Sequence, residues 1–167
     1  MKGTSPPPSD DIRALAARLG DLALASRVML ATAESCTGGL VAGAITDIAG
    51  SSAWFERGFV TYSNRAKMEE LGVDPDIIAR HGAVSGETAK AMAQGARAAS
   101  GAQWAVAVTG IAGPAGGSPD KPVGTVWFAW AGPRAVETLH WRLEGDRAAV
   151  RTASVAIALQ GLVDRLV

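Results

Sequence analysis

Hydrophobic and polar residues alternate along the chain in blocks that predict alternating helices and strands. From Ser9 the apolar residues recur at intervals of three and four, which is typical of one buried face of a helix. Residues 28–33 form a short apolar run, as in a buried strand, and the polar, glycine-containing segment 34–39 follows it. Helix-forming residues resume at 40–48. The first third of the chain therefore predicts helix, strand, tight loop and helix.

The middle of the chain predicts two more strands with helices between them. Residues 58–63 are rich in aromatic and β-branched side chains, and a short helical stretch to Leu71 follows them. Residues 104–108 are almost entirely apolar, which is typical of a strand covered on both faces. Between these strands, Ser85 can cap a helix that runs to about residue 99.

The last part of the chain predicts a hairpin and a closing helix. Residues 123–130 and 135–143 are strand-like, and a turn containing Gly and Pro joins them. The helix that starts after Gly145 and Asp146 has apolar residues on two faces, so we expect it to lie between the sheet and a partner subunit. Early strand–helix alternation with a late hairpin predicts an α/β fold: one three-layer α/β/α domain with a five-stranded mixed sheet.

Length and composition narrow the class of protein. The chain has 167 residues, enough for one domain, and we expect residues 1–9, which contain three consecutive prolines, to form a flexible tail before a domain at 10–167. Sixteen basic residues balance sixteen acidic ones, so no net positive field favours nucleic acid or an anionic membrane. No apolar run reaches the ~18 residues of a membrane span. We expect a cytoplasmic protein whose partner is a small molecule.

Polar side chains follow three of the predicted strands, at the edge where open α/β sheets bind ligands. They are Ser35, the segment 62–64, and Thr109. Ser35 lies in a sharp strand-to-helix turn, where main-chain N–H groups and the helix dipole can stabilise an oxyanion, so it is a candidate nucleophile. The alternative is that Ser35 or Thr37 only caps the helix.

A serine nucleophile needs a base, and the sequence offers few. The two histidines, His81 and His140, do not fall at predicted strand ends. Lys67 lies near the start of the helix after the second strand and could reach the same edge, provided that burial or a nearby positive charge keeps it neutral. The alternative is a solvated lysine. Cys36 is a rival nucleophile, or else a small buried hydrophobic residue.

Two features point to anion binding. Arg147 and Arg151 lie one turn apart on the closing helix and could present two guanidinium groups to a phosphate or carboxylate, or could simply be exposed. The loop 110–114 could bring main-chain N–H groups to a phosphate, although it lacks the sequence of a phosphate-binding loop. One cysteine and two histidines match no metal-ligand spacing, so we predict no metal.

Five ordered segments carry the most specific pattern in the chain. They are AESCTGG at 33–39, YSN at 62–64 with Lys67, VTGIAGP at 108–114, KPVG at 121–124, and GDR at 145–147 with Arg151. Together they resemble the CinA C-terminal domain family, which includes nicotinamide-nucleotide amidases. The resemblance covers almost everything after residue 10 and fits a stand-alone amidase domain.

The resemblance implies hydrolysis of the carboxamide of nicotinamide mononucleotide to nicotinate mononucleotide and ammonia, in pyridine-nucleotide salvage and without a cofactor. It implies Ser35 as the nucleophile and Lys67 as its base, with Tyr62 and Thr109 orienting the amide and N–H groups at the helix start holding the oxyanion. The residues that we assign to substrate binding on this basis are Glu34, Thr37, Gly38, Gly39, Asn64, Gly110, Arg147 and Arg151. We also expect a homo-oligomer.

Two other functions stay open at this point. The first is a non-catalytic nucleotide-binding or interaction module that uses the same cleft as a sensor or docking site. The second is a nucleotide pyrophosphatase or phosphatase, which would normally require a divalent metal held by carboxylates. Release of ammonia from the mononucleotide distinguishes the amidase from both.

Overall fold

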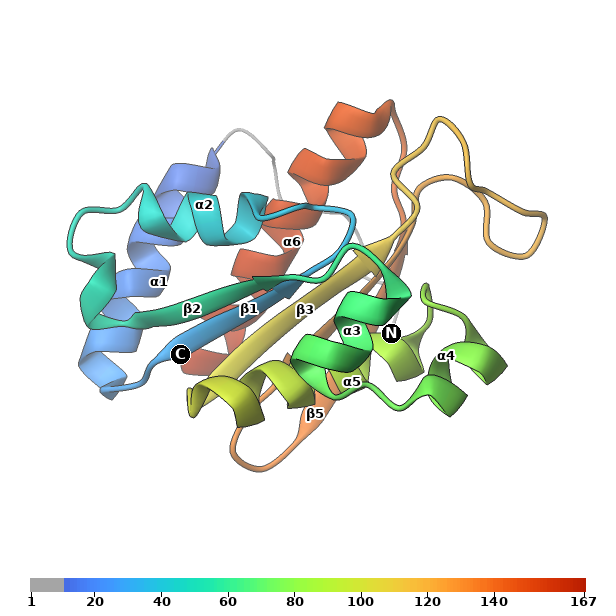
Figure 1. Cartoon of the computed structure of the whole chain (residues 1–167). Helices are drawn as coiled ribbons and strands as arrows, with labels where there is room; N and C mark the ends of the chain where they lie inside the picture. Colours follow the sequence, from blue (N-terminus) through green and yellow to red (C-terminus); the bar gives the residue numbers. More distant parts are fainter. Residues whose placement is uncertain (1–10) are drawn as a thin grey trace.

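A five-stranded mixed sheet forms the middle layer of the computed structural model, which describes residues 11–167 (Figure 1). The strands are β1 (Leu30–Glu34), β2 (Phe55–Val60), β3 (Trp104–Gly110), β4 (Thr125–Ala131) and β5 (Val136–Arg142). Their spatial order is β2-β1-β3-β4-β5, with β1 parallel to β2 and β3, and with β4 antiparallel to both β3 and β5. The predicted fold class is therefore confirmed. The predicted tail at 1–9 lies outside the described residues.

Helices cover both faces of this sheet (Figure 1). One face carries α1 (Ile12–Ser26), α2 (Leu40–Thr46) and α6 (Arg147–Leu166). The other carries α5 (Gly86–Ser100), with α3 (Asn64–Leu71) and α4 (Pro75–His81) beside it. A 3-10 turn, η2 (Ser51–Ala53), precedes β2. Within residues 11–167, no helix is both long enough and apolar enough to cross a membrane.

The two layers beside the sheet differ in the size of their core side chains. The face under α1 and α6 buries large residues, among them Leu19, Phe128 and Trp130. The face under α5 is built mainly from alanine, for example Ala93 and Ala107. Small side chains let a helix lie close to a sheet. The α5 layer is therefore thin, and it brings α5 and its neighbours close to the strand ends.

The two apolar faces of α6 are both covered within this chain. One faces the sheet, where Trp130 donates a hydrogen bond from Nε1 to the carbonyl oxygen of Ala158 over 3.0 Å. The other packs against α1. At Gly161 a Cβ atom would overlap the Trp130 ring, so only glycine allows this close approach. The second apolar face therefore does not require a partner subunit, and the predicted homo-oligomer would have to use another surface.

Three elements differ from the sequence prediction. β2 begins at Phe55 and ends at Val60, earlier than the predicted 58–63, because it is an edge strand whose exposed polar residues interrupt the apolar pattern. The strand predicted at 123–130 begins instead at Thr125, after Gly124 adopts a φ of 90°. The sequence analysis also missed α4, which has no fully buried residue and so lacks the apolar stripe of a core helix.

Candidate active site

The carboxyl ends of β1 and β3 open into a cleft of about 280 Å³. This is the edge where α/β sheets commonly bind ligands. Eight of the sequence-predicted residues line it: Ser35, Cys36, Tyr62, Asn64, Lys67, Thr109, Gly110 and Arg147. The structure therefore brings together polar groups that are up to 112 positions apart in the sequence.

A buried lysine and a serine form the centre of this cleft. Nζ of Lys67 lies 3.0 Å from Oγ of Ser35 and donates to it, and a second hydrogen bond of 2.7 Å joins Nζ to the carbonyl oxygen of Thr61. Lys67 is 1% exposed and Ser35 is 9% exposed. The lysine comes from the middle of α3, whose first turn is capped by Oγ of Ser63. The predicted alternative of a solvated lysine is therefore wrong.

The environment of Lys67 favours its neutral form. Burial lowers the pKa of Lys67 from its ordinary 10.5 to about 8, because the ammonium group loses hydration and no carboxylate among residues 11–167 forms an ion pair with it. With such a pKa, roughly a tenth of the side chains are neutral at pH 7. A neutral amine at hydrogen-bond distance from a hydroxyl has the geometry of a general base.

Cys36 lines the same cleft but is poorly suited to act as a nucleophile. Burial, with a smaller contribution from the nearby charge of Glu34, raises the pKa of the Cys36 thiol to about 11. A thiol with this pKa is protonated near neutral pH, whereas thiol reactivity requires the thiolate. The geometry favours Ser35, which is the residue in contact with the lysine.

Glu34, which the resemblance assigned to substrate binding, lies outside the cleft lining and is fully buried. Its carboxylate accepts hydrogen bonds from the main-chain N–H groups of Val41 and Ala42, over 2.8 and 3.0 Å. The N-cap residue of α2 is Gly39, so neither Ser35 nor Thr37 caps the helix as the alternative predicted. Glu34 instead satisfies the first turn of α2 and ties it to the end of β1.

The N–H groups in the first turn of α2 are already paired, so the expectation that N–H groups at the helix start hold the oxyanion does not extend to α2 itself. The N–H group of Leu40 donates to the carbonyl oxygen of Thr37, and Glu34 occupies those of Val41 and Ala42. Four residues of turn separate Ser35 from the first residue of α2. A main-chain oxyanion donor would therefore have to lie outside the first turn of α2.

Arg147 spans the mouth of the cleft. Its Nη1 donates to the carbonyl oxygen of Gly113 over 2.9 Å, and its Nη2 donates to Oη of Tyr62 over 3.0 Å. Tyr62 is 61% exposed, and Asn64 at the start of α3 is also exposed. These three side chains are thus positioned to meet the part of a ligand that lies farthest from Ser35.

Arg151 and the remaining residues of the turn occupy a different position from the one expected. The Arg151 guanidinium contacts the carbonyl oxygens of Cys36 and Thr37 and does not line the cleft. Gly38 and Gly39 adopt positive φ values of 57° and 99°, which close the turn between Ser35 and α2. None of the residues from Thr37 to Gly39 lines the cleft.

Thr109 is buried, and its Oγ1 donates to the carbonyl oxygen of Ala83 over 2.8 Å. It therefore fastens the connection between α4 and α5 to the end of β3. The sequence analysis missed the small and apolar residues that complete the cleft wall, which are Ala83, Val84, Ile111, Ala112, Ala115 and Gly116. Nothing in their residue types marks them, because they shape the cleft mainly through the course of the main chain.

Both histidines lie outside the cleft lining, as the sequence predicted. His81 ends α4, 3.6 Å from a carboxylate oxygen of Glu87, and His140 stacks on Trp127 in the hairpin. Across the described part of the chain, no three His, Cys, Asp or Glu side chains gather as metal ligands would. The lysine is thus the basic side chain in contact with Ser35.

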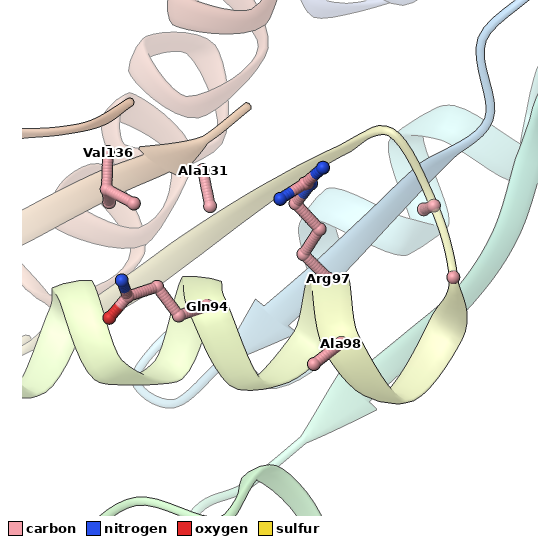
Figure 2. A pocket seen from close by; sticks show the side chains of 7 residues that line it. Gln94, Arg97, Ala98, Ala131 and Val136 are labelled. Carbon is pink, nitrogen blue, oxygen red and sulfur yellow. The ribbon is translucent and has the colours of Figure 1, made fainter. Parts of the chain in front are cut away.

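A larger hollow of about 430 Å³ lies between the C-terminal half of α5 and the hairpin (Figure 2). Figure 2 shows Gln94, Arg97 and Ala98 on the helix, with Ala131 and Val136 facing them. Nε of Arg97 donates to the carbonyl oxygen of Gln103 over 3.0 Å. No residue that lines this hollow carries a nucleophile or a proton acceptor suited to catalysis.

Fold and cleft together define an enzyme of the α/β class, with a lysine–serine pair buried at the carboxyl ends of parallel strands. The chain belongs to the CinA C-terminal domain family, whose sequence profile matches residues 12–166. The family predicted from the five motifs is therefore confirmed.

Close relatives share most of the chain. It is 54% identical to the nicotinamide-nucleotide amidohydrolase PncC of Pseudomonas putida over 154 residues, which is 92% of this chain and 96% of the relative. The protein of the same name from Escherichia coli K12 is 54% identical over 91% of this chain and 93% of its own. The crystal structure of the competence/damage inducible protein CihA from Agrobacterium tumefaciens superposes with a TM-score of 0.88 at 48% identity, covering 97% of this chain and 98% of that one.

Proposed function

We propose that this chain hydrolyses the carboxamide of nicotinamide mononucleotide, with Ser35 as the nucleophile and Lys67 as its general base. The chain is an amidohydrolase, as its 54% identity to amidohydrolases over more than nine-tenths of its length indicates. The observation that carries the proposed mechanism is the 3.0 Å contact between Lys67 Nζ and Ser35 Oγ inside a buried cleft.

The reaction proceeds in two halves. Neutral Lys67 takes the hydroxyl proton of Ser35 while Oγ attacks the carboxamide carbon and forms a tetrahedral intermediate. The C–N bond then breaks, the ammonium group of Lys67 returns a proton to the departing nitrogen, and ammonia leaves an acyl-enzyme ester. Water attacks this ester, with Lys67 again accepting the proton, and the carboxylate product leaves as Ser35 regains its hydrogen.

The mouth of the cleft supports a phosphorylated substrate. Arg147 holds a fixed cation next to Tyr62 and the loop after β3, at the outer side of the cleft lining. A guanidinium group pairs well with a phosphate, and binding energy from that remote group positions the amide over the nucleophile. We therefore expect weak activity on free nicotinamide and on the riboside, both of which lack the phosphate.

Ammonia release from nicotinamide mononucleotide tests the proposal. Wild type should release ammonia and form nicotinate mononucleotide, whereas Ser35→Ala should lose at least about 10⁴-fold in kcat because no nucleophile remains. Ser35→Ala should still bind the mononucleotide in a calorimetric titration. Cys36→Ala is the matched control, and it should keep its activity within a few-fold because its thiol is protonated.

The same assay separates the other functions. A wild-type protein that binds the mononucleotide without releasing ammonia would favour the non-catalytic module. Loss of all activity in a chelating agent would favour a metal-dependent pyrophosphatase or phosphatase. Full activity of Ser35→Ala would disprove the serine mechanism, and it would leave the substrate assignment to be judged from the product alone.

A further inference from the structure

Arg151 holds the turn that carries the nucleophile. Its Nε donates to the carbonyl oxygen of Cys36 over 3.1 Å, and its Nη2 donates to that of Thr37 over 3.3 Å. The side chain comes from α6, which lies far along the sequence from the turn. A single guanidinium group thus fixes two consecutive peptide groups directly after Ser35.

The hydrogen bonds of this turn leave three N–H groups without an oxygen acceptor. The carbonyl oxygen of Ser35 accepts from the N–H group of Gly38 over 3.0 Å, while those of Cys36 and Thr37 are held by Arg151. Within residues 11–167, no oxygen atom accepts a hydrogen bond from the N–H group of Cys36, Thr37 or Gly39, and of these residues only Cys36 lines the cleft. Unpaired donors of this kind are unusual in a buried segment.

The planarity of the peptide bond links these two observations. In a trans peptide, the N–H group points away from the carbonyl oxygen of the preceding residue. Fixing the Ser35 carbonyl through Gly38 therefore directs the Cys36 N–H group to the opposite side. Fixing the Cys36 carbonyl through Arg151 holds the next peptide group as well, so Cys36 lies between two fixed peptide groups and its N–H group keeps its direction.

We propose that Arg151 is a positioning residue, which holds the turn so that the main-chain N–H group of Cys36, the residue of the turn after Ser35 that lines the cleft, faces the carboxamide oxyanion and stabilises it. This proposal rests on the proposed function, because it takes Ser35 as the nucleophile. It gives Arg151 a role different from phosphate binding, which the sequence suggested for it together with Arg147. The two arginines lie one turn apart on α6, but only Arg147 lines the cleft.

The guanidinium group suits this task better than an ammonium group would. Its Nε and Nη2 atoms are fixed in one plane, so they reach two neighbouring carbonyl oxygens without a change of rotamer. A lysine at the same position would offer a single point charge on a flexible stem. Arg151→Lys should therefore keep part of the effect, and Arg151→Met should lose all of it.

Steady-state kinetics of Arg151→Met, with Arg147→Met as the matched control, test the proposal. We expect Arg151→Met to lower kcat by about 10²-fold and to change KM by less than about threefold, because the lost interaction is made only in the transition state. Arg147→Met should instead raise KM. A variant Arg151→Met with normal kcat, whether its KM is raised or not, would overturn the proposal.

Amide hydrogen exchange provides a readout that does not need turnover. Arg151→Met should speed exchange in segment 36–39, while Arg147→Met should leave it unchanged. Unchanged exchange in Arg151→Met would overturn the proposal even if kcat fell. If Arg151→Met does not fold, the same two measurements are made on Arg151→Lys. We expect an intermediate loss of kcat in that variant, and a normal kcat would contradict the proposal. Full activity of Ser35→Ala would instead count against the proposed function.

Discussion

The cleft beside Ser35 and the hollow beside Arg97 are lined by different kinds of side chain. The hollow is the larger, at about 430 Å³ against 280 Å³, yet its walls are mostly alanine, glycine and valine with one cation. The smaller cleft contains a buried lysine, three hydroxyl groups and a thiol. Reactivity therefore depends on which polar groups a fold removes from water, and the size of a hollow says little about it.

Burying polar groups lowers stability at the cleft. Within the described part of the chain, the buried Lys67 has no carboxylate partner, and the buried hydroxyl groups of Thr37 and Thr61 have no hydrogen-bond partner. An unsatisfied buried hydroxyl costs about 1–3 kcal/mol. None of the side chains that line the hollow beside Arg97 is among the buried ones that lack a hydrogen-bond partner. Substitutions at the cleft should therefore change activity, whereas substitutions at the hollow beside Arg97 should change only the free energy of unfolding.

After the loss of Ser35 itself, the largest effect should come from Lys67→Met. We expect kcat to fall at least about 10³-fold, because Ser35 loses its base. We also expect the free energy of unfolding at pH 7 to rise by roughly 1–3 kcal/mol, because folding no longer has to remove an ammonium group from water. Ammonia release and urea denaturation measure the two effects.

The sign of the stability effect depends on pH. Between pH 8 and 10.5 the unfolded chain binds a proton at Lys67 that the folded chain has released, so stability rises with pH across that window. The stabilising effect of Lys67→Met should therefore be smaller at pH 9.5 than at pH 7. The exposed Lys90 on α5 provides the control, since Lys90→Met should change neither kcat nor the pH dependence of the free energy of unfolding.

Glu34→Gln should have the next largest effect. The amide can accept from only one of the N–H groups of Val41 and Ala42, and its own NH₂ group would face the other. We expect the free energy of unfolding to fall by about 1–3 kcal/mol and kcat to fall by roughly tenfold to a hundredfold. Thermal denaturation and kinetics check this, and a variant as stable and active as wild type would refute the role of Glu34 in holding α2.

The pH profile of kcat/KM should follow the titration of Lys67. Only the neutral amine can accept the serine proton, so kcat/KM should rise about tenfold per pH unit below pH 8 and then level off near the pKa of about 8. A profile that is flat from pH 6 to 9 would show that Lys67 is not the base. Cys36→Ala should give the same profile as wild type.

Arg147→Ala should have a smaller effect, on KM. Removing one guanidinium contact from a phosphate should raise KM for the mononucleotide by roughly tenfold. The riboside has no phosphate, so its kcat/KM should change by less than about twofold. An equal loss on both substrates would mean that Arg147 acts through Tyr62 and Gly113, to which it is hydrogen-bonded, and not through the phosphate.

The smallest effect should come from Arg97→Ala at the other end of the sheet. Arg97 lies in the last turn of α5 and donates to Gln103, so its loss should lower the free energy of unfolding by at most about 1 kcal/mol. Ammonia release should stay within about twofold of wild type. A larger loss of activity would show that the hollow beside Arg97 is coupled to the cleft, and that the two regions do not act separately.

Local sequence signals were enough to predict most of the fold. The helix caps at Ser63 and Ser85 and the apolar run of β3 are visible in the chain itself, because caps and burial patterns depend on near neighbours. Elements without such signals were predicted poorly. The helix α4 was missed because it buries no residue fully, and the bounds of β2 were misplaced because it is an exposed edge strand. The second apolar face of α6 indicated burial correctly but could not indicate that α1 covers it.

The sequence by itself determined which residue types stand at the ends of β1, β2 and β3, and therefore which chemistry was available. Only the tertiary structure decided their roles. Arg147 and Arg151 look alike in sequence, but one faces the cleft and the other holds the turn after Ser35. Glu34 supports α2 and does not reach the ligand. The physical reason is that orientation and burial depend on contacts between residues distant in sequence, and spacing along the chain carries no record of those contacts.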